Sequence, residues 1–270
     1  MRVTRLATGG GAGKIALAGF SHGAQLAYHY ASIEATRPAA LRHVKALVPI
    51  DFYGALAPDQ VDVRAALCQL SADAHAALDD GVIDASNEFL TSIGSLARTA
   101  PTAASPWLPP LDNRVAMLVT VGRTYRLGVP YAPLYHLAAP ILDPITGRPI
   151  GLSETTEDAA TAWLAGGPPH GSMREAAELE GLICGDGPQP IDAPLARITV
   201  PLFYLGAAGG VGELGLYSTT QVGSTDVTTL VVQELAPAQL AADFGHVDLL
   251  FAADAPARAW APLAAWLAQH

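Results

Sequence analysis

The chain has 270 residues, half of them hydrophobic, which is enough to bury a sizeable core as one domain plus an insertion. Its net charge of −10 and the lack of any basic cluster argue against a nucleic-acid partner. The longest uncharged stretches, including 127–142 and 198–212, contain Pro or Gly and are shorter than a bilayer span, so we expect no transmembrane helix.

The first residues, through Thr8, have the pattern of a helix end that leads into a strand. No apolar stretch of secretory-signal length follows the arginines in this region. The glycine-rich run 9–13 is only superficially similar to a phosphate-binding loop. Ile15 stands where such a loop needs a hydroxyl group, and a strand-like run follows where a helix is needed. We therefore expect no cofactor here.

The sequence Gly19-Phe20-Ser21-His22-Gly23 is a G-x-S-x-G step between two periodic runs. The run 14–18 is short and apolar, as in a buried strand, whereas 24–31 is rich in helix formers. A serine on a sharp turn from strand to helix is the context of a nucleophile elbow. The flanking glycines are expected to be required, because side chains there would prevent the turn from closing. The alternative is a tight turn that carries an incidental serine.

A serine hydroxyl needs a base to accept its proton and an acid to orient that base. Near the C-terminus, Gly245-His246 follows a β-branched run, 226–232, and precedes a helix-like segment. The sequence has eight histidines, and His246 stands out through its loop position and its glycine neighbour. His22 follows the serine on the elbow, where its side chain should point away. Its backbone N–H could serve as one donor of an oxyanion hole.

Two carboxylates are candidates for the acid. Asp51 ends the apolar strand 47–50, which should lie beside the nucleophile strand. Glu213 follows the later strand 201–206 and a glycine-rich loop. We favour Asp51, because alanine and glycine occupy the positions directly after the later strand. Either residue could instead have a structural role, as a cap or as a first-turn carboxylate of a helix.

The middle of the chain, residues 55–195, has mainly helical patterns over 59–78, 86–96 and 176–183, the last after a capping box that begins at Ser172. Six large apolar or aromatic residues in it could shape an apolar pocket or, as is more common, form the segment's own core: Trp107, Leu108, Tyr125, Tyr131, Tyr135 and Trp163. Cys68 and Cys184 bracket most of this segment and could form a disulfide or remain buried thiols. No metal-binding motif is apparent, so we predict no metal.

Taken together, these residues resemble the α/β-hydrolase superfamily, specifically its esterase and lipase-like members, over residues 14–54 and 197–268. The resemblance implies an α/β-hydrolase fold, with a partial parallel sheet flanked by helices and a large, mainly helical cap. It divides the chain into core (1–54), cap (55–195) and core (196–270). It also implies hydrolysis of a small apolar ester in which Ser21, Asp51 or Glu213, and His246 act in the order nucleophile, acid and base. No cofactor is implied.

The family usually places several strands and an oxyanion-hole loop before the elbow strand, whereas only 13 residues precede Lys14 here. We expect that the recorded chain starts late relative to the whole protein; a shortened family member is the alternative. An apolar edge at 15–18 would then be exposed and could support self-association. The compartment is not fixed by the sequence, and secretion would require a signal before Met1. A peptidase, a thioesterase or a non-catalytic module remain alternative functions.

Overall fold

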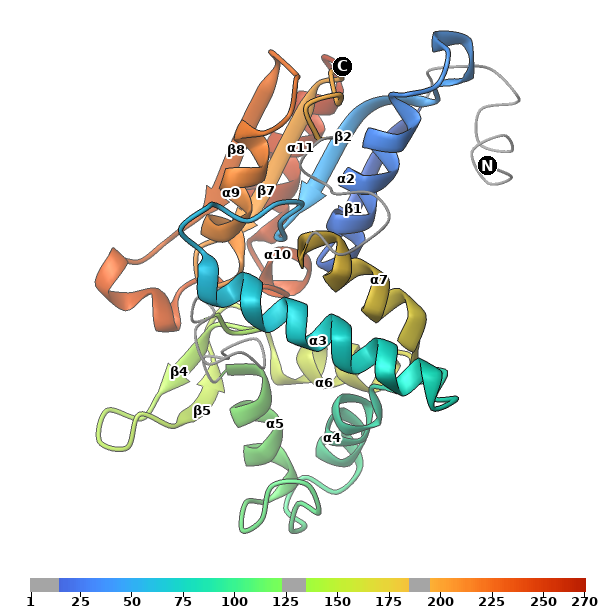
Figure 1. Ribbon diagram of the computed structural model, residues 1–270. Helices are drawn as coiled ribbons and strands as arrows, with labels where there is room; N and C mark the ends of the chain where they lie inside the picture. Colours follow the sequence, from blue (N-terminus) through green and yellow to red (C-terminus); the bar gives the residue numbers. More distant parts are fainter. Residues whose placement is uncertain (1–14, 123–134, 185–194) are drawn as a thin grey trace.

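The computed structural model describes residues 15–122, 135–184 and 195–270 (Figure 1). The predicted fold class is confirmed: it is an α/β structure with a parallel sheet flanked by helices. Among these residues the sheet has four strands in the order β1-β2-β7-β8, and all neighbouring strands are parallel. Their bounds are β1 (Ile15–Phe20), β2 (Val44–Ile50), β7 (Leu202–Ala207) and β8 (Val227–Val232).

In the described part of the chain, seven helical segments lie outside the region between β2 and β7. They are α2 (His22–Glu34), η1 (Ala39–Leu41), α9 (Gly212–Thr220), η2 (Pro237–Ala242), α10 (Asp248–Phe251), η3 (Pro256–Trp260) and α11 (Ala261–Leu267). The remaining elements lie between β2 and β7. They are α3 (Val61–Asp79), β3 (Asp84–Ser86), α4 (Glu88–Thr99), α5 (Asn113–Gly122), β4 (Pro140–Leu142), β5 (Pro149–Leu152), α6 (Glu157–Gly166), β6 (His170–Ser172) and α7 (Met173–Cys184).

Both faces of the central strands are buried, as expected of a parallel sheet. Side chains alternate along β2, so Leu47 packs with Tyr28 of α2 on one face. Val48 packs on the other face, together with Trp266 of α11. This alternation explains why β2 and β7 appear in the sequence as continuous apolar runs.

β1 lies at one edge of the sheet, where it pairs with β2 among the described residues. Exposure alternates along its first residues, with Ala16 and Ala18 more exposed than Ile15 and Leu17. Because β1 and β2 are parallel and in register, with Phe20 opposite Ile50, the two strands end together. Self-association through this edge stays a prediction.

The segment between β2 and β7 is mainly helical, as predicted, and it has its own hydrophobic core. Met117 and Leu118 of α5 are fully buried there with Ile93 of α4 and Leu164 of α6. In Figure 1, α4 and α5 lie on the far side of α3 from the sheet. The described part of the segment also contains two short antiparallel pairs, β3 with β6 and β4 with β5.

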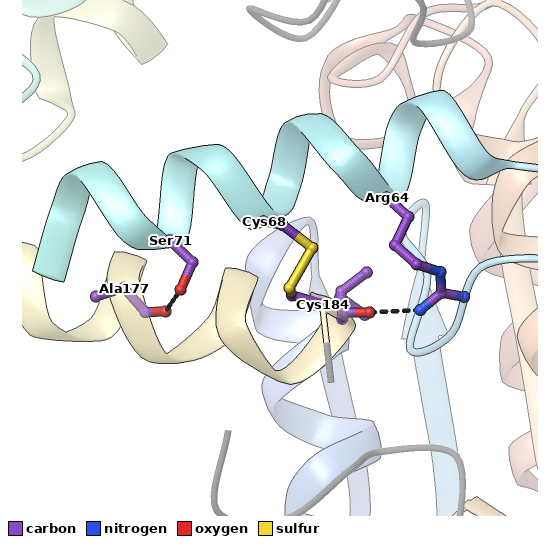
Figure 2. Close-up of a disulfide and its surroundings, with 6 residues drawn as sticks. Arg64, Cys68, Ser71, Ala177 and Cys184 are labelled. Carbon is purple, nitrogen blue, oxygen red and sulfur yellow. Dashed lines mark hydrogen bonds between the residues drawn. A yellow bond between two sulfur atoms is a disulfide. The ribbon is translucent and has the colours of Figure 1, made fainter. Parts of the chain in front are cut away.

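Cys68 of α3 and Cys184 at the end of α7 form a disulfide (Figure 2). Two further contacts join the same helices. Arg64 Nη1 donates to the carbonyl of Ile183 at 2.6 Å, and Ser71 Oγ donates to the carbonyl of Ala177 at 2.9 Å. The question that the sequence left open is therefore answered in favour of the disulfide, which fastens α7 along α3.

The helix start predicted at Ser172 is present, since its hydroxyl accepts from the Glu175 amide at 3.2 Å. Of the six apolar or aromatic residues singled out in this segment, Leu108, Tyr135 and Trp163 pack against the core formed by α4, α5 and α6. Trp107 is 40% exposed, and Tyr125 and Tyr131 lie outside the described residues. Across the part of the chain that the structure describes, no helix is both long and apolar enough to cross a membrane.

Candidate active site

The turn between β1 and α2 holds Ser21 in an unusual backbone conformation, with φ 56° and ψ −130°. Such a positive φ is costly for a residue other than glycine and is typical of functional sites. A Cβ on Gly19 would overlap the backbone of Gly23, so Gly19 is required by the turn. A Cβ on Gly23 would meet no described atom within 4 Å. The expectation that both glycines are required is therefore wrong for Gly23.

The backbone fixes Ser21 at the carboxyl edge of the sheet. Its N–H donates to the carbonyl of Ile50, the residue before Asp51, at 3.0 Å. Its own carbonyl accepts from the amide of Ala24 at 2.8 Å in the first turn of α2. The predicted nucleophile and the favoured acid thus follow the ends of two adjacent parallel strands.

Asp51 is fully buried and also has a positive φ, of 49°. Its Oδ1 accepts from the amide of Ala207 at 2.8 Å, and its Oδ2 accepts from the amide of Val211 at 3.1 Å. Ala207 is the last residue of β7, and Val211 lies in the loop that follows it. A Cβ on Gly210 would overlap the Asp51 carboxylate, so the glycine-rich loop is what lets the backbone close around the acid.

His246 contacts Asp51 directly: the distance from Nδ1 to Oδ2 is 2.6 Å, and the histidine is only 5% exposed. Because an ionised carboxylate can only accept, the proton of the neutral ring belongs on Nδ1 and leaves Nε2 as a base. Phe20, the residue before Ser21, stacks on the imidazole with ring centroids 4.4 Å apart. Tyr135 meets the ring edge-on at 6.1 Å.

The other two predicted residues lie differently. Glu213 is exposed in the first turn of α9, and the carboxylate that His246 binds is Asp51. His22 is the first residue of α2, so its backbone N–H has no acceptor within the helix. The side chain of His22 points to α7, where Nε2 lies 3.4 Å from Oε1 of Glu180, and its ring meets Phe52 edge-on.

Sequence reasoning missed the residues that hold the His246 loop. The carbonyl of His136, in the middle segment, accepts from the His246 amide at 3.0 Å. The His136 side chain is buried, and its Nε2 lies 2.6 Å from the carbonyl oxygen of Asp243. Burial lowers the pKa of His136. Asp248 also binds this loop, and the spacing Gly-His-x-Asp was the available sequence signal.

The described residues contain one group of carboxylates with the spacing of a metal site, namely Glu154, Glu234 and Asp254. Arg258 binds two of them, with Nη2 3.0 Å from Glu234 and Nε 3.0 Å from Asp254. This guanidinium already supplies the positive charge that the carboxylates require. The group lacks histidine or cysteine ligands, and a structural ion-pair network accounts for it.

No family model and no curated protein sequence matches the chain. Solved structures do resemble it. A monoacylglycerol lipase from Paleococcus ferrophilus is 13% identical with a TM-score of 0.39, and the match covers 86% of this chain and 61% of the lipase. An acetylester hydrolase from Corynebacterium glutamicum is 14% identical with a TM-score of 0.40, and the match covers 92% of this chain and 59% of the hydrolase.

An α/β-hydrolase enzyme from a Medee basin deep-sea metagenome library is 11% identical with a TM-score of 0.35, and the match covers 92% of this chain and 64% of that enzyme. The chain therefore spans about three fifths of the length of these proteins. In its own architecture, a parallel sheet carries Ser21 on a strand-to-helix turn and a buried Asp51–His246 pair at the same edge. The chain is thus an α/β protein that is similar in structure to these hydrolases.

Proposed function

We propose that this protein is a serine hydrolase that cleaves carboxylic esters through an acyl-enzyme. The observation that carries the proposal is the 2.6 Å hydrogen bond between His246 Nδ1 and Asp51 Oδ2. That bond is buried, and it lies at the sheet edge where Ser21 adopts a positive φ. A triad is recognised by such geometry and by the roles that its members can take.

In the first half of the reaction, His246 Nε2 accepts the Ser21 hydroxyl proton as Oγ attacks the ester carbonyl carbon. The N–H of His22 donates to the developing oxyanion, at the start of a helix whose dipole also favours negative charge. When the tetrahedral intermediate collapses, the bond to the alcohol oxygen breaks. The imidazolium then gives its proton to the leaving alcohol.

In the second half, His246 takes a proton from water while the water oxygen attacks the acyl carbon. The released carboxylic acid takes its acyl group from Ser21, and the serine regains its proton from His246. Asp51 stays ionised throughout. It keeps the Nδ1 proton in place and stabilises the imidazolium, which is the role expected of a buried acid bound to two backbone amides.

The substrate that we propose is a small, uncharged, apolar ester, and residues 55–195 are proposed to serve as a cap beside the site. Two features support a substrate of this class. Phe20 and Tyr135 flank the imidazole, and the acidic net charge disfavours anionic substrates. A panel of p-nitrophenyl esters, thioesters and peptide anilides compares the cleavage of ester, thioester and amide bonds, and esters should be turned over fastest.

The decisive experiment is labelling by a fluorophosphonate probe, which forms a covalent bond with an activated serine. Ser21→Ala should abolish both labelling and ester hydrolysis. Ser32→Ala is the matched control, because Ser32 lies on the same helix and only donates to the carbonyl of His29. This control should retain labelling. Undiminished labelling of Ser21→Ala would sink the assignment, and unlabelled wild-type protein would favour a non-catalytic module.

A further inference from the structure

The loop that carries His246 is held by a segment from the middle of the chain. The amides of His246 and Val247 donate to the carbonyls of His136 and Leu137, at 3.0 Å and 2.7 Å. The two contacts join consecutive residues of both segments. The position of the imidazole therefore depends on residues more than a hundred positions earlier in the chain.

The side chain of Asp248 completes this arrangement. Its Oδ2 accepts from the amide of Gly245 at 2.8 Å and from the amide of Ala139 at 2.7 Å. In return, the amide of Asp248 lies 3.2 Å from the carbonyl of Gly245, which accepts from it. Gly245 and Asp248 are thus joined by two hydrogen bonds, and His246 lies between these two residues in the chain. The same carboxylate oxygen also joins this turn to Ala139 of the middle segment.

Stability does not explain a carboxylate at this position. Asp248 is fully buried, and its Oδ1 has no hydrogen-bond partner among the residues that the structure describes. Its pKa is raised to about 6, chiefly by burial and to a smaller extent by Glu154, although the amides of Gly245 and Ala139 and the Thr155 hydroxyl act to lower it. A buried acid that costs stability is characteristic of functional sites.

We propose that Asp248 is a positioning residue for His246: it fixes the Gly245–His246 peptide to Ala139 and so holds the imidazole against Asp51. The proposal rests on the proposed function, in which His246 is the base. Asp248 acts through hydrogen-bond acceptance, so its charge is not required. Gly245 supports this reading, because a Cβ there would overlap the carbonyl of Leu137 and push the two segments apart.

Two substitutions separate the hydrogen bonds from the charge. Asp248→Asn retains an oxygen that can accept from both amides and places its NH₂ group toward the Thr155 hydroxyl. Asp248→Ser keeps a residue that is favoured at helix starts, but its hydroxyl is too short to bridge Gly245 and Ala139. Asp143→Ala is the control, because this exposed aspartate also accepts two turn amides, in the distant β4–β5 hairpin.

We expect Asp248→Ser to lower kcat by about 10- to 100-fold with KM within about twofold, because small misplacement of a catalytic group acts on the chemical step. Asp248→Asn should stay within about threefold of the wild-type kcat, and Asp143→Ala should match the wild type. The downfield proton resonance of His246 Nδ1, identified by its loss in His246→Ala, should disappear in Asp248→Ser and persist in Asp248→Asn.

The resonance does not depend on turnover, so it tests Asp248 even if Ser21 proves not to be a nucleophile. A normal resonance and kcat in folded Asp248→Ser would overturn the proposal. Equal losses in the Ser and Asn variants would do the same, because they would show that the charge is needed. If circular dichroism shows that Asp248→Ser does not fold, Asp248 serves the fold in general and the proposal is likewise wrong.

Discussion

Replacing Asp51 by asparagine removes one charge and one acceptor from a side chain that three N–H groups contact: the amides of Ala207 and Val211 and the Nδ1–H of His246. If the new oxygen accepts from Ala207, the NH₂ group faces the histidine. The ring must then expose an unprotonated Nδ1 and carry its proton on Nε2. In that tautomer it cannot accept the Ser21 proton.

The size of the effect follows from this geometry. A histidine held in the wrong tautomer lowers kcat about 10⁴-fold in a Ser-His-Asp triad, or about 5.5 kcal/mol in the activation free energy. Either orientation also sets the NH₂ group against a backbone N–H at a fully buried site: that of Val211 in the first orientation and that of Ala207 in the reversed one. Two facing donors there cost about 1–3 kcal/mol of folding free energy.

Hydrolysis of p-nitrophenyl butyrate gives kcat, and calorimetry reports whether Asp51→Asn stays folded. Glu213→Gln is the matched control, because it makes the same change at the other candidate acid, which is exposed. We expect it to retain wild-type kcat within about twofold. If Asp51→Asn keeps a tenth of the wild-type kcat, or if Glu213→Gln loses as much, the reasoning about the acid is refuted.

Three substitutions and the reduction of the disulfide test stability. Gly19→Ala should lower the free energy of unfolding by about 1–3 kcal/mol or more, because the new Cβ would overlap the backbone of Gly23. Gly23→Ala should raise it by up to about 1 kcal/mol, because alanine favours the helix α2. Equal effects of the two substitutions in urea titrations would contradict this expectation. Reducing Cys68–Cys184, which spans 116 residues of sequence, should lower the free energy of unfolding by about 2–4 kcal/mol, and an unchanged Tm under dithiothreitol would argue against it. Because burial raises the pKa of Asp248 from 3.8 to about 6, its neutral form stabilises the fold below about pH 4, and about 3 kcal/mol is lost as pH rises through about 6. Asp248→Asn, neutral throughout, should therefore gain stability over the wild type between pH 4 and pH 7, and a difference independent of pH would count against the ionisation.

The sequence predicted the elements whose side chains mark them. The apolar runs before Ser21 and Asp51 are β1 and β2, and the helix after Ser172 begins where its hydroxyl caps it. It did not predict α5 or α6. The first of these, Asn113–Gly122, is rich in β-branched residues and is helical only because its apolar face packs into the α4–α6 core.

The sequence favoured Asp51 over Glu213 as the acid but could not decide between them. The donors that surround Asp51 are backbone amides, which every residue except proline carries, so they leave no mark in the sequence. Only the glycines of the loop after β7 hint at a close approach. The role of His136 was invisible for the same reason, because its contact with His246 is made by its carbonyl.

The hydrogen bonds between 136–139 and 245–248 also bear on how this chain can be engineered or can evolve. Residues 55–195 look exchangeable in the sequence, because they lie between two halves of a core. Excising them, or grafting the corresponding region of another protein, would leave the amides of His246 and Val247 without their acceptors and would remove one of the two amides that donate to Asp248, that of Ala139. A working chimaera should therefore keep the original residues 136–139. The parts that can be exchanged lie before and after this stretch.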